Sequence, residues 1–277
     1  MKPSRLKLKT EPLGLQYDPT NFRLFKNGLE LIPEIRRLKD LFDVIYDKEF
    51  YREANKEMPL YYMYRGVVRD QDGDGDRELC KRYSLRFDVT IIPPLMLGEE
   101  YVKTLGHCHS EVAKGITYPE LYEVLQGEAH FLLQRWVGDQ SPYGLAKIKD
   151  AVLLRASEGE RIFIKPNYGH ITINPSGVTL VLANWVSSAS ESLYEPYRRM
   201  GGGAYFELAG GRFIPNARYK CLPSLRIVRA HEIQIPQLPA ARNIYDAFIR
   251  HPECLKFLND PKFIETSDLL KRKNEGI

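Results

Sequence analysis

The sequence lacks the features that usually mark a membrane-spanning or disulfide-stabilised protein. Its 277 residues contain no run of about 18 apolar residues, the length that a membrane-spanning helix requires. The four cysteines form no CxxC pair and no closely spaced framework, and no apolar segment typical of a signal peptide follows Met1. We therefore expect reduced thiols, a cytoplasmic location and no membrane partner.

An excess of one charge is also missing. The chain has 40 basic and 36 acidic residues, which leaves a net charge of +4. This balance gives no reason to expect a nucleic-acid partner. Because 43% of the residues are hydrophobic, the chain can bury a large core, and we expect a single domain over residues 1–277.

The hydrophobic pattern divides this domain into three parts. Residues 1–59 predict an N-terminal arm and a helix over 31–56, and residues 231–277 predict a C-terminal helical extension with the segments AARNIYDAFIRHPECLKFL and DLLKRKNEG. Between them, residues 60–230 show short runs of β-branched and aromatic residues separated by turn signals, which is typical of an antiparallel sandwich or barrel. The predicted fold class is all-β with helical segments at both ends. The predicted helical stripe over 31–56 consists of Ile35, Leu38, Leu41, Phe42 and Ile45.

The segment TLGHCHSEVAKGITYPELYEVLQG, residues 104–127, carries the main candidates for chemistry. Side chains two residues apart in a strand share a face, so His107 and His109 point the same way, and so do Glu120 and Tyr122. His170 begins a further apolar strand, HITIN. Three imidazoles and one carboxylate on inward faces of a barrel form a donor set for a first-row divalent metal. Such a set leaves coordination positions open, which suits catalysis.

Two of these segments resemble the motifs of the cupin superfamily. More narrowly, TLGHCH, PELYEVLQGEAHFLLQ and KPNYGHITIN are similar to the cupin-type glucose-6-phosphate isomerases, over roughly residues 60–206. The chain departs from the common cupin pattern in the longer gap between His109 and Glu120 and in a spacing from Pro166 to His170 that is one residue shorter. The resemblance implies a double-stranded β-helix, or jelly-roll, barrel. The matching residues are His107, His109, Glu120 and Gly127 for the first motif, and Gly159, Pro166, His170 and Asn174 for the second.

The resemblance also implies a reaction. The enzyme would be a metal-dependent aldose–ketose isomerase that interconverts glucose 6-phosphate and fructose 6-phosphate in glycolysis and gluconeogenesis. Its single metal per chain would be held by His107, His109, Glu120 and His170, with Fe²⁺ favoured and Mn²⁺, Ni²⁺, Co²⁺ or Zn²⁺ as alternatives. Hydrogen would move from carbon to carbon either as a proton through a cis-enediol, with Glu120 as base, or as a hydride. Tyr122 would donate a hydrogen bond to a sugar oxygen.

A phosphate pocket is the second implication of the resemblance. The family's threonine hydroxyls and glycine amide fall on Thr90, Thr104 and Gly106. Strand parity places Thr104 and Gly106 opposite His107 unless a bulge forms at Gly106. A pocket tyrosine falls on Tyr197, with Tyr194 as the alternative. Further pocket candidates are Lys103 and Tyr62.

Two other functions fit the same metal site: an iron-dependent cupin dioxygenase and a non-catalytic sugar-binding cupin. For every alternative we expect a small-molecule partner, a sugar phosphate in the isomerase case. We also expect a homodimer, because the open edges of such sheets need covering.

Several other motifs predict no site. DQDGDGDRE, residues 70–78, lacks the glycine and the glutamate of a calcium-binding loop at the required positions and predicts an acidic hairpin loop. Glycines 201–203 lack the context of a phosphate-binding loop and predict a tight turn or a flap. His130, His231 and His251 are placed outside the metal site.

Overall fold

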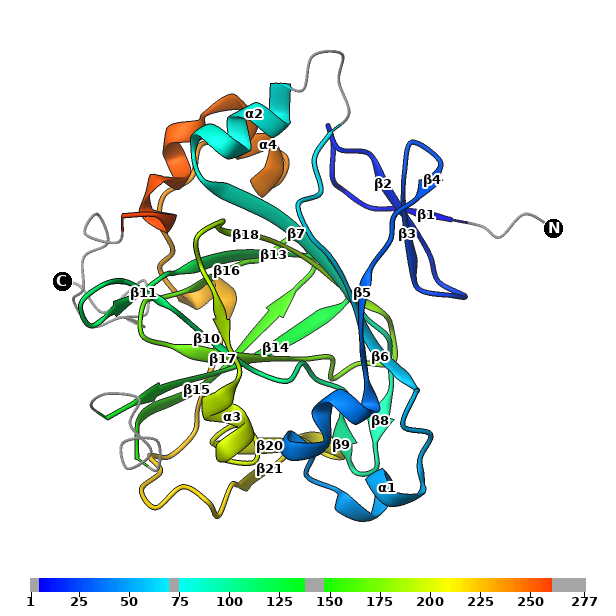
Figure 1. Ribbon diagram of the computed structural model, residues 1–277, viewed down its shortest axis with the longest axis vertical. Coiled ribbons are helices and arrows are strands. Elements are labelled where there is room, and N and C mark those ends of the chain that lie inside the picture. The colour runs from blue at the N-terminus through cyan, green and yellow to red at the C-terminus, as the bar shows by residue number, and fades with distance from the viewer. Residues whose placement is uncertain (1–4, 70–74, 138–146, 261–277) are drawn as a thin grey trace.

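Two facing β-sheets form the body of the protein, as the computed structural model, which describes residues 5–69, 75–137 and 147–260, shows in Figure 1. The first sheet is antiparallel throughout, with the order β16 (Arg161–Ile164), β13 (Glu120–Gln126), β18 (Leu180–Ser187), β7 (Leu85–Ile92), β6 (Pro59–Tyr64) and β5 (Glu34–Arg37). The second has the order β17 (Gly169–Ile173), β14 (Glu128–Trp136), β15 (Ile148–Ser157) and β22 (Arg226–Arg229). Its neighbours are antiparallel except β15 and β22.

Smaller elements surround these two sheets. A third sheet has the order β21 (Arg212–Pro215), β20 (Tyr205–Leu208), β9 (Glu100–Tyr101) and β8 (Met96–Leu97), and two short pairs join β10 (Cys108–His109) to β19 (Ser192–Leu193) and β11 (Glu111–Ala113) to β12 (Ile116–Thr117). The α-helices are α1 (Lys48–Glu53), α2 (Gly75–Arg82), α3 (Glu195–Arg199) and α4 (Ile244–Arg250). The 3₁₀ helices are η1 (Leu38–Val44), η2 (Ala209–Gly211), η3 (Ala230–Glu232) and η4 (Pro252–Leu258). Among the described residues, no helix has the length and apolar character needed to cross a bilayer.

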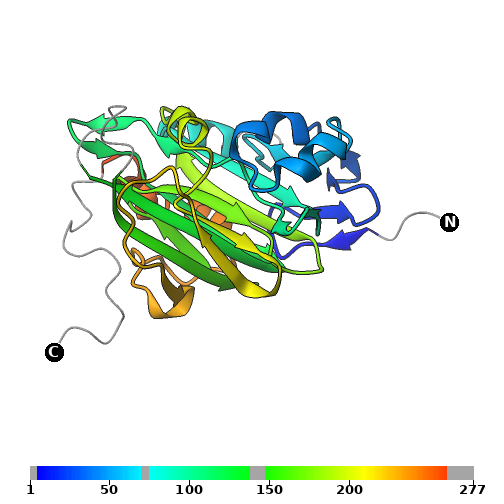
Figure 2. The ribbon, with the colours of Figure 1, turned by 90° about the horizontal axis from the view of Figure 1, so that it is seen from below.

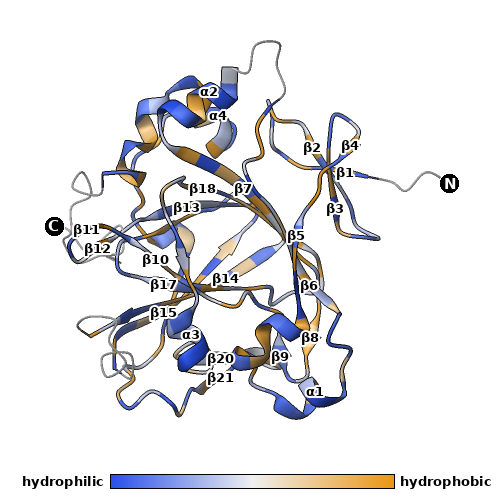
Figure 3. Ribbon diagram, viewed as in Figure 1, coloured by the Kyte–Doolittle hydropathy of each residue, from blue (hydrophilic) through white to orange (hydrophobic). Residues whose placement is uncertain are grey.

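The first sheet is buried on both faces, and residue parity decides which face each side chain joins. In β18, Leu180 and Leu182 pack into the core between the sheets, whereas Val181, Ala183 and Trp185 belong to a second core on the outer face. Figure 3 shows the same alternation along β7, where hydrophilic residues interrupt hydrophobic ones. A ring contact of 5.1 Å between Tyr122 of β13 and Phe131 of β14 joins the two sheets. This arrangement confirms the expected all-β class.

The N-terminal residues add a small sheet and not an extended arm. Strands β1 (Leu6–Lys7), β2 (Leu15–Asp18), β3 (Arg23–Lys26) and β4 (Leu29–Glu30) pair in chain order, and Figures 1 and 2 show them at one end of the molecule. Leu24 is buried there, and its amide donates a hydrogen bond of 3.0 Å to the hydroxyl of Tyr64. This small sheet therefore covers part of the outer face of β6.

The prediction of one helix over residues 31–56 is wrong. The segment forms β5, η1 and α1 in succession. Residues 34–37 pair with β6, with Ile35 opposite Tyr62, so pairing at the sheet edge overrides the local helical pattern. Leu38, Leu41 and Ile45 are still buried, in the core between the sheets.

Two further expectations meet the structure only in part. Residues 75–78 of the acidic segment begin helix α2 and are not part of a hairpin loop, while residues 70–74 lie outside the described residues. Helices α4 and η4 confirm helical structure within AARNIYDAFIRHPECLKFL, but DLLKRKNEG lies outside the described residues.

Trp185 ties the C-terminal helices to the outer face of the first sheet. It is fully buried, its indole N–H donates a 3.0 Å hydrogen bond to the carbonyl of Ile244, and its ring lies 4.5 Å from that of Phe248 and 4.9 Å from that of Phe87. We predict that Trp185→Ala lowers the free energy of unfolding by about 3–5 kcal/mol, because it opens a cavity in this core. Urea denaturation followed by circular dichroism measures the change.

Ile32→Ala is the control for this variant, because Ile32 is 94% exposed. It should shift the free energy of unfolding by no more than about 0.5 kcal/mol. A loss below about 1 kcal/mol for Trp185→Ala would show that the C-terminal helices do not depend on this contact.

Candidate metal centre and substrate pocket

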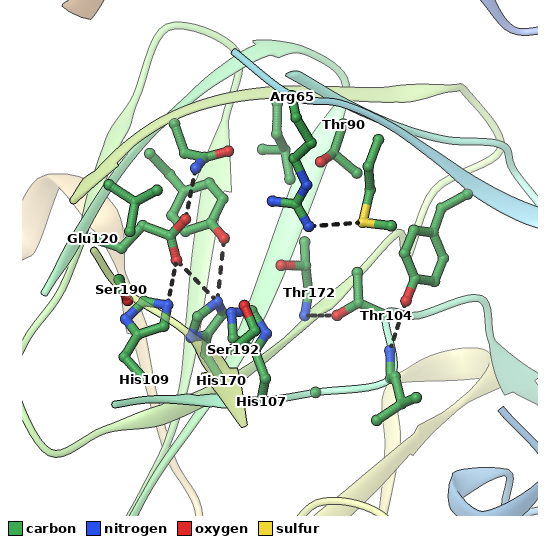
Figure 4. A pocket seen from close by; sticks show the side chains of 18 of the residues that line it. Arg65, Thr90, Thr104, His107, His109, Glu120, His170, Thr172, Ser190 and Ser192 are labelled. Atoms are coloured by element: carbon green, nitrogen blue, oxygen red, sulfur yellow. Dashed lines mark hydrogen bonds and ion pairs between the residues drawn. The ribbon is translucent and has the colours of Figure 1, made fainter. Parts of the chain in front are cut away.

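A pocket between the two sheets contains most of the residues that the sequence singled out (Figure 4). Side chains of β6, β7, β13, β17 and β18 line it, together with the segments 104–109 and 190–194. The residues that line the pocket include Tyr61, Met63, Arg65, Arg86, Thr90, Thr104, Gly106, His107, His109, Glu120, Tyr122, His170, Thr172, Asn184, Ser190, Ser192 and Tyr194.

A backbone irregularity brings Thr104 and His107 to the same pocket. Lys103 pairs with Ile173 and His107 with His170, so the chain advances four residues on one side and three on the other. The extra residue is a β-bulge, and Gly106 within it has a φ of +87°. A Cβ at Gly106 would lie 2.6 Å from Ile171 Cγ1 and 2.8 Å from Tyr197 Cδ1, so only glycine fits. The bulge that the parity argument required is therefore present.

Three histidines and one glutamate converge in this pocket. One potential ligand atom from each of His107, His109 and Glu120 lies within 4.8 Å of the other two. Nε2 of His170 lies 3.4 Å from Glu120 Oε2, and Nε2 of His109 lies 3.3 Å from the same oxygen. The imidazole rings of His107 and His170 are 4.4 Å apart. Residues from three separate segments thus face one point.

Neighbouring groups orient two of these side chains. Nδ1 of His109 lies 2.8 Å from the carbonyl oxygen of Tyr118. Because a carbonyl can only accept, Nδ1 donates its hydrogen to Tyr118, and Nε2 faces Glu120. The side-chain amide of Asn184 donates a 2.6 Å hydrogen bond to Glu120 Oε1. Outer contacts of this kind typically fix the ligands of a metal.

The protonation states also suit a cation. Burial lowers the pKa of His170 to about 4, and burial together with His170 and His109 lowers the pKa of His107 well below its usual value. Burial on its own would raise the pKa of Glu120, but the adjacent His109 and His170 side chains bring it below its usual value. His107 and His170 are therefore neutral, and Glu120 is ionised, near pH 7, as metal ligands must be.

The donor set fits a divalent metal. Glu120 Oε2 is buried and, among the described residues, has no hydrogen-bond donor, although it faces two imidazoles. An ionised buried oxygen without a donor is costly unless a cation neutralises it. His107, His109 and Glu120 place ligand atoms close enough to share one ion, and His170 adds a nitrogen 3.4 Å from Glu120 Oε2.

Comparison with known proteins identifies the family of this chain. The model of the family described as "Glucose-6-phosphate isomerase (GPI)" matches residues 35–222. The chain belongs to this family. The match confirms the resemblance to the cupin-type glucose-6-phosphate isomerases that the motifs indicated.

Individual relatives are more distant. The chain is 29% identical over 140 residues to the glucose-6-phosphate isomerase of Thermococcus onnurineus, which covers 50% of this chain and 61% of the relative. It is 27% identical over 167 residues to the glucose-6-phosphate isomerase of Pyrococcus furiosus, and this match covers 59% of this chain and 72% of the relative. Among solved structures, the oxalate decarboxylase of Bacillus subtilis matches with a TM-score of 0.30 and 13% identity over 48% of this chain and 28% of that one. Because the match with the Thermococcus onnurineus relative spans 61% of its length, the relatives' activity is a proposal for this chain.

The structure places the residues suggested by the glucose-6-phosphate isomerase motifs in two groups. Thr90, Thr104, Gly106 and Tyr122 line the pocket. The hydroxyl of Tyr122 lies 3.2 Å from Nε2 of His170. Thr104 is also fixed on the wall, because its hydroxyl accepts a 2.9 Å hydrogen bond from the amide of Thr172.

Three other candidates point away from the pocket. Tyr197 is fully buried beneath Gly106, with its ring 5.7 Å from that of Trp136, and Tyr194 lines the pocket instead. Tyr62 faces the outer core, because it sits on the opposite side of β6 from Tyr61 and Met63. Lys103 is buried in contact with Glu100 and the carbonyl of Val44.

One polar wall of the pocket was not predicted from the sequence. Arg86, Asp88 and Thr90 alternate along β7 and share one face, and Arg65 follows directly after β6. A signal was available, because the motif had placed Thr90 in the pocket and the alternation in LRFDVT puts Arg86 and Asp88 on the same face as Thr90. Thr172, Ser190 and Ser192 complete the polar lining.

We predict that His107→Ala, His109→Ala and His170→Ala each weaken divalent-metal binding by at least about tenfold, because each removes a nitrogen ligand. Elemental analysis after dialysis at limiting metal measures the loss. His231→Ala is the control, because His231 is largely exposed and contacts Glu160 far from the pocket. Full metal occupancy in all three variants would contradict the ligand assignment.

Proposed function

We propose that this protein is a metal-dependent isomerase that interconverts glucose 6-phosphate and fructose 6-phosphate. The observation that carries the proposal is the convergence of His107, His109, Glu120 and His170 in one pocket of a chain that belongs to the glucose-6-phosphate isomerase family. Its relatives from Thermococcus onnurineus and Pyrococcus furiosus are glucose-6-phosphate isomerases. The pocket also carries threonine hydroxyls on the wall beside the metal ligands, as a phosphorylated sugar requires.

Isomerisation moves hydrogen between C1 and C2 while negative charge develops on the attached oxygens. A divalent metal held by the three histidines and Glu120 would stabilise that charge as a Lewis acid. In the proton-transfer route Glu120 is the base. Its Oε1 is fixed by Asn184, whereas its Oε2 faces the pocket without a donor among the described residues. Glu120 would then act both as a ligand of the metal and as the base that takes a proton from carbon.

Tyr122 would act as a hydrogen-bond donor in this reaction. Burial first, and then the neighbouring Glu120 carboxylate, raises the pKa of Tyr122 well above its usual value. The hydroxyl therefore keeps its proton at every pH at which the enzyme would work. Next to His170 Nε2, it can donate to a substrate oxygen while charge develops there.

Four finer points belong to this proposal. Fe²⁺ is the favoured metal, although nitrogen and oxygen ligands also accept Mn²⁺, Ni²⁺, Co²⁺ and Zn²⁺. The protein is expected to be a homodimer, since β5 is an edge strand of the first sheet. The expected location is the cytoplasm, where sugar phosphates are metabolised. Thr90 and Thr104 are the proposed phosphate-binding hydroxyls, with the amide of Gly106.

The direct test supplies fructose 6-phosphate to the metal-loaded protein and follows NADP⁺ reduction by added glucose-6-phosphate dehydrogenase. We expect turnover that a chelator abolishes and Fe²⁺ or another divalent metal restores, because the ligands are neutral or acceptor groups that cannot polarise a carbonyl without the ion. Omitting the protein gives the background rate. No turnover with a full metal complement would remove the isomerase assignment, and oxygen consumption would instead favour a dioxygenase.

We predict that Glu120→Gln lowers kcat by at least about 100-fold, because glutamine cannot accept the proton. Glu123→Gln is the matched control. Glu123 lies on the same strand but on the outer face, where its carboxylate accepts a 2.6 Å hydrogen bond from the amide of Ile244. This control should keep its kcat within about twofold of the parent. Near-normal turnover by Glu120→Gln with metal still bound would exclude Glu120 as the base.

A further inference from the structure

Two arginines share one buried carboxylate on the wall of the pocket. Asp88 is 1% exposed, and its oxygens accept hydrogen bonds of 2.8 Å from Arg65 Nη1, 2.9 Å from the Gly66 amide, and 2.9 and 3.0 Å from Arg86 Nε. Two guanidinium groups and one carboxylate leave this wall with a net charge of +1. Both arginines line the pocket, so the positive charge faces its interior.

Arg65 has hydrogen-bonding capacity that the protein uses poorly. Its Nη1 contacts Asp88, but the partner of its Nη2 is the thioether sulfur of Met63, at 3.4 Å. A thioether is a weak acceptor, and a guanidinium offers five N–H donors. Held by Asp88 on one side, Arg65 therefore presents strong donors to whatever enters the pocket.

The position of Arg65 relates it to both halves of the site. Figure 4 shows its guanidinium extending toward Thr172, with Thr90 and Thr104 on one side and Glu120 and His109 on the other. The threonine hydroxyls are uncharged, and Lys103 is committed to Glu100 and the Val44 carbonyl. Among the described residues that line the pocket, the permanent positive charges are those of Arg65 and Arg86.

We propose that Arg65, held in place by Asp88, is the cationic contact of the substrate's phosphate group. This inference rests on the proposed function. A phosphate dianion matches the planar guanidinium fork, which can donate two parallel hydrogen bonds to it. Arg65 completes the threonine wall and makes the pocket selective for phosphorylated over unphosphorylated sugars.

The test compares Arg65→Gln, Arg65→Lys and Arg212→Gln with the parent, all metal-loaded. Arg212 is the matched charge control, because it pairs with Glu99 at the exposed edge of β21. With fructose 6-phosphate, Arg65→Gln should raise KM by at least about tenfold while kcat changes by less than about threefold, since a hydrogen bond to a charged group is lost in the bound and transition states alike. The KM of Arg65→Lys should lie between those of Arg65→Gln and the parent. The KM of Arg212→Gln should match that of the parent.

Calorimetry with inorganic phosphate separates this inference from the isomerase assignment. Phosphate should bind the parent and Arg212→Gln equally, and Arg65→Gln at least about tenfold more weakly. Arg65-dependent phosphate binding without isomerase turnover would support the anion site and overturn the proposed function. If the enzyme turns over and Arg65→Gln has the same KM and the same phosphate affinity as Arg212→Gln, the role of Arg65 is overturned. Failure of the parent to bind millimolar phosphate would also overturn it.

Discussion

The site depends on the register between the segment before β10 and strand β17. The amide of His107 donates to the carbonyl of His170 at 3.1 Å, and the amide of His170 donates to the carbonyl of His107 at 3.0 Å. This reciprocal bridge sets two imidazoles side by side, although they come from segments far apart in the chain. The bulge at Gly106 then turns Thr104 toward the same pocket. A shift of one residue in this register would move the paired side chains to the other face.

In the first sheet, alternate residues of a strand face either the pocket or the outer core. Its inner face supplies Glu120 and Asn184, whereas the residues directly after them, Leu121 and Trp185, belong to the outer core. The outer face is covered by the small N-terminal sheet and by helix α4, so the strands that carry the site pack on both faces. Such packing suits a metal site, because the ligands need a fixed geometry. The helical and N-terminal additions thus support the pocket without lining it.

The all-β class could be predicted from the short β-branched runs and turn signals, because these are local patterns. Strand parity and motif spacing predicted that four side chains meet in one site. The helix over 31–56 was wrongly predicted, since the pairing of β5 with β6 is a long-range contact that no local pattern reveals. The choice between Tyr194 and Tyr197 depended on the course of the chain into α3, where Tyr197 turns beneath Gly106. Arg65 was missed because its role depends on Asp88, which lies on the neighbouring strand.

The central claim is that His107, His109, Glu120 and His170 share one divalent cation. X-ray absorption spectroscopy at the metal edge of the iron- or manganese-loaded protein tests it most directly. The account predicts a first shell of nitrogen and oxygen at about 2.0–2.2 Å with the outer-shell scattering of three imidazoles. A first shell of oxygen alone, sulfur ligation, or scattering from no more than one imidazole would contradict it.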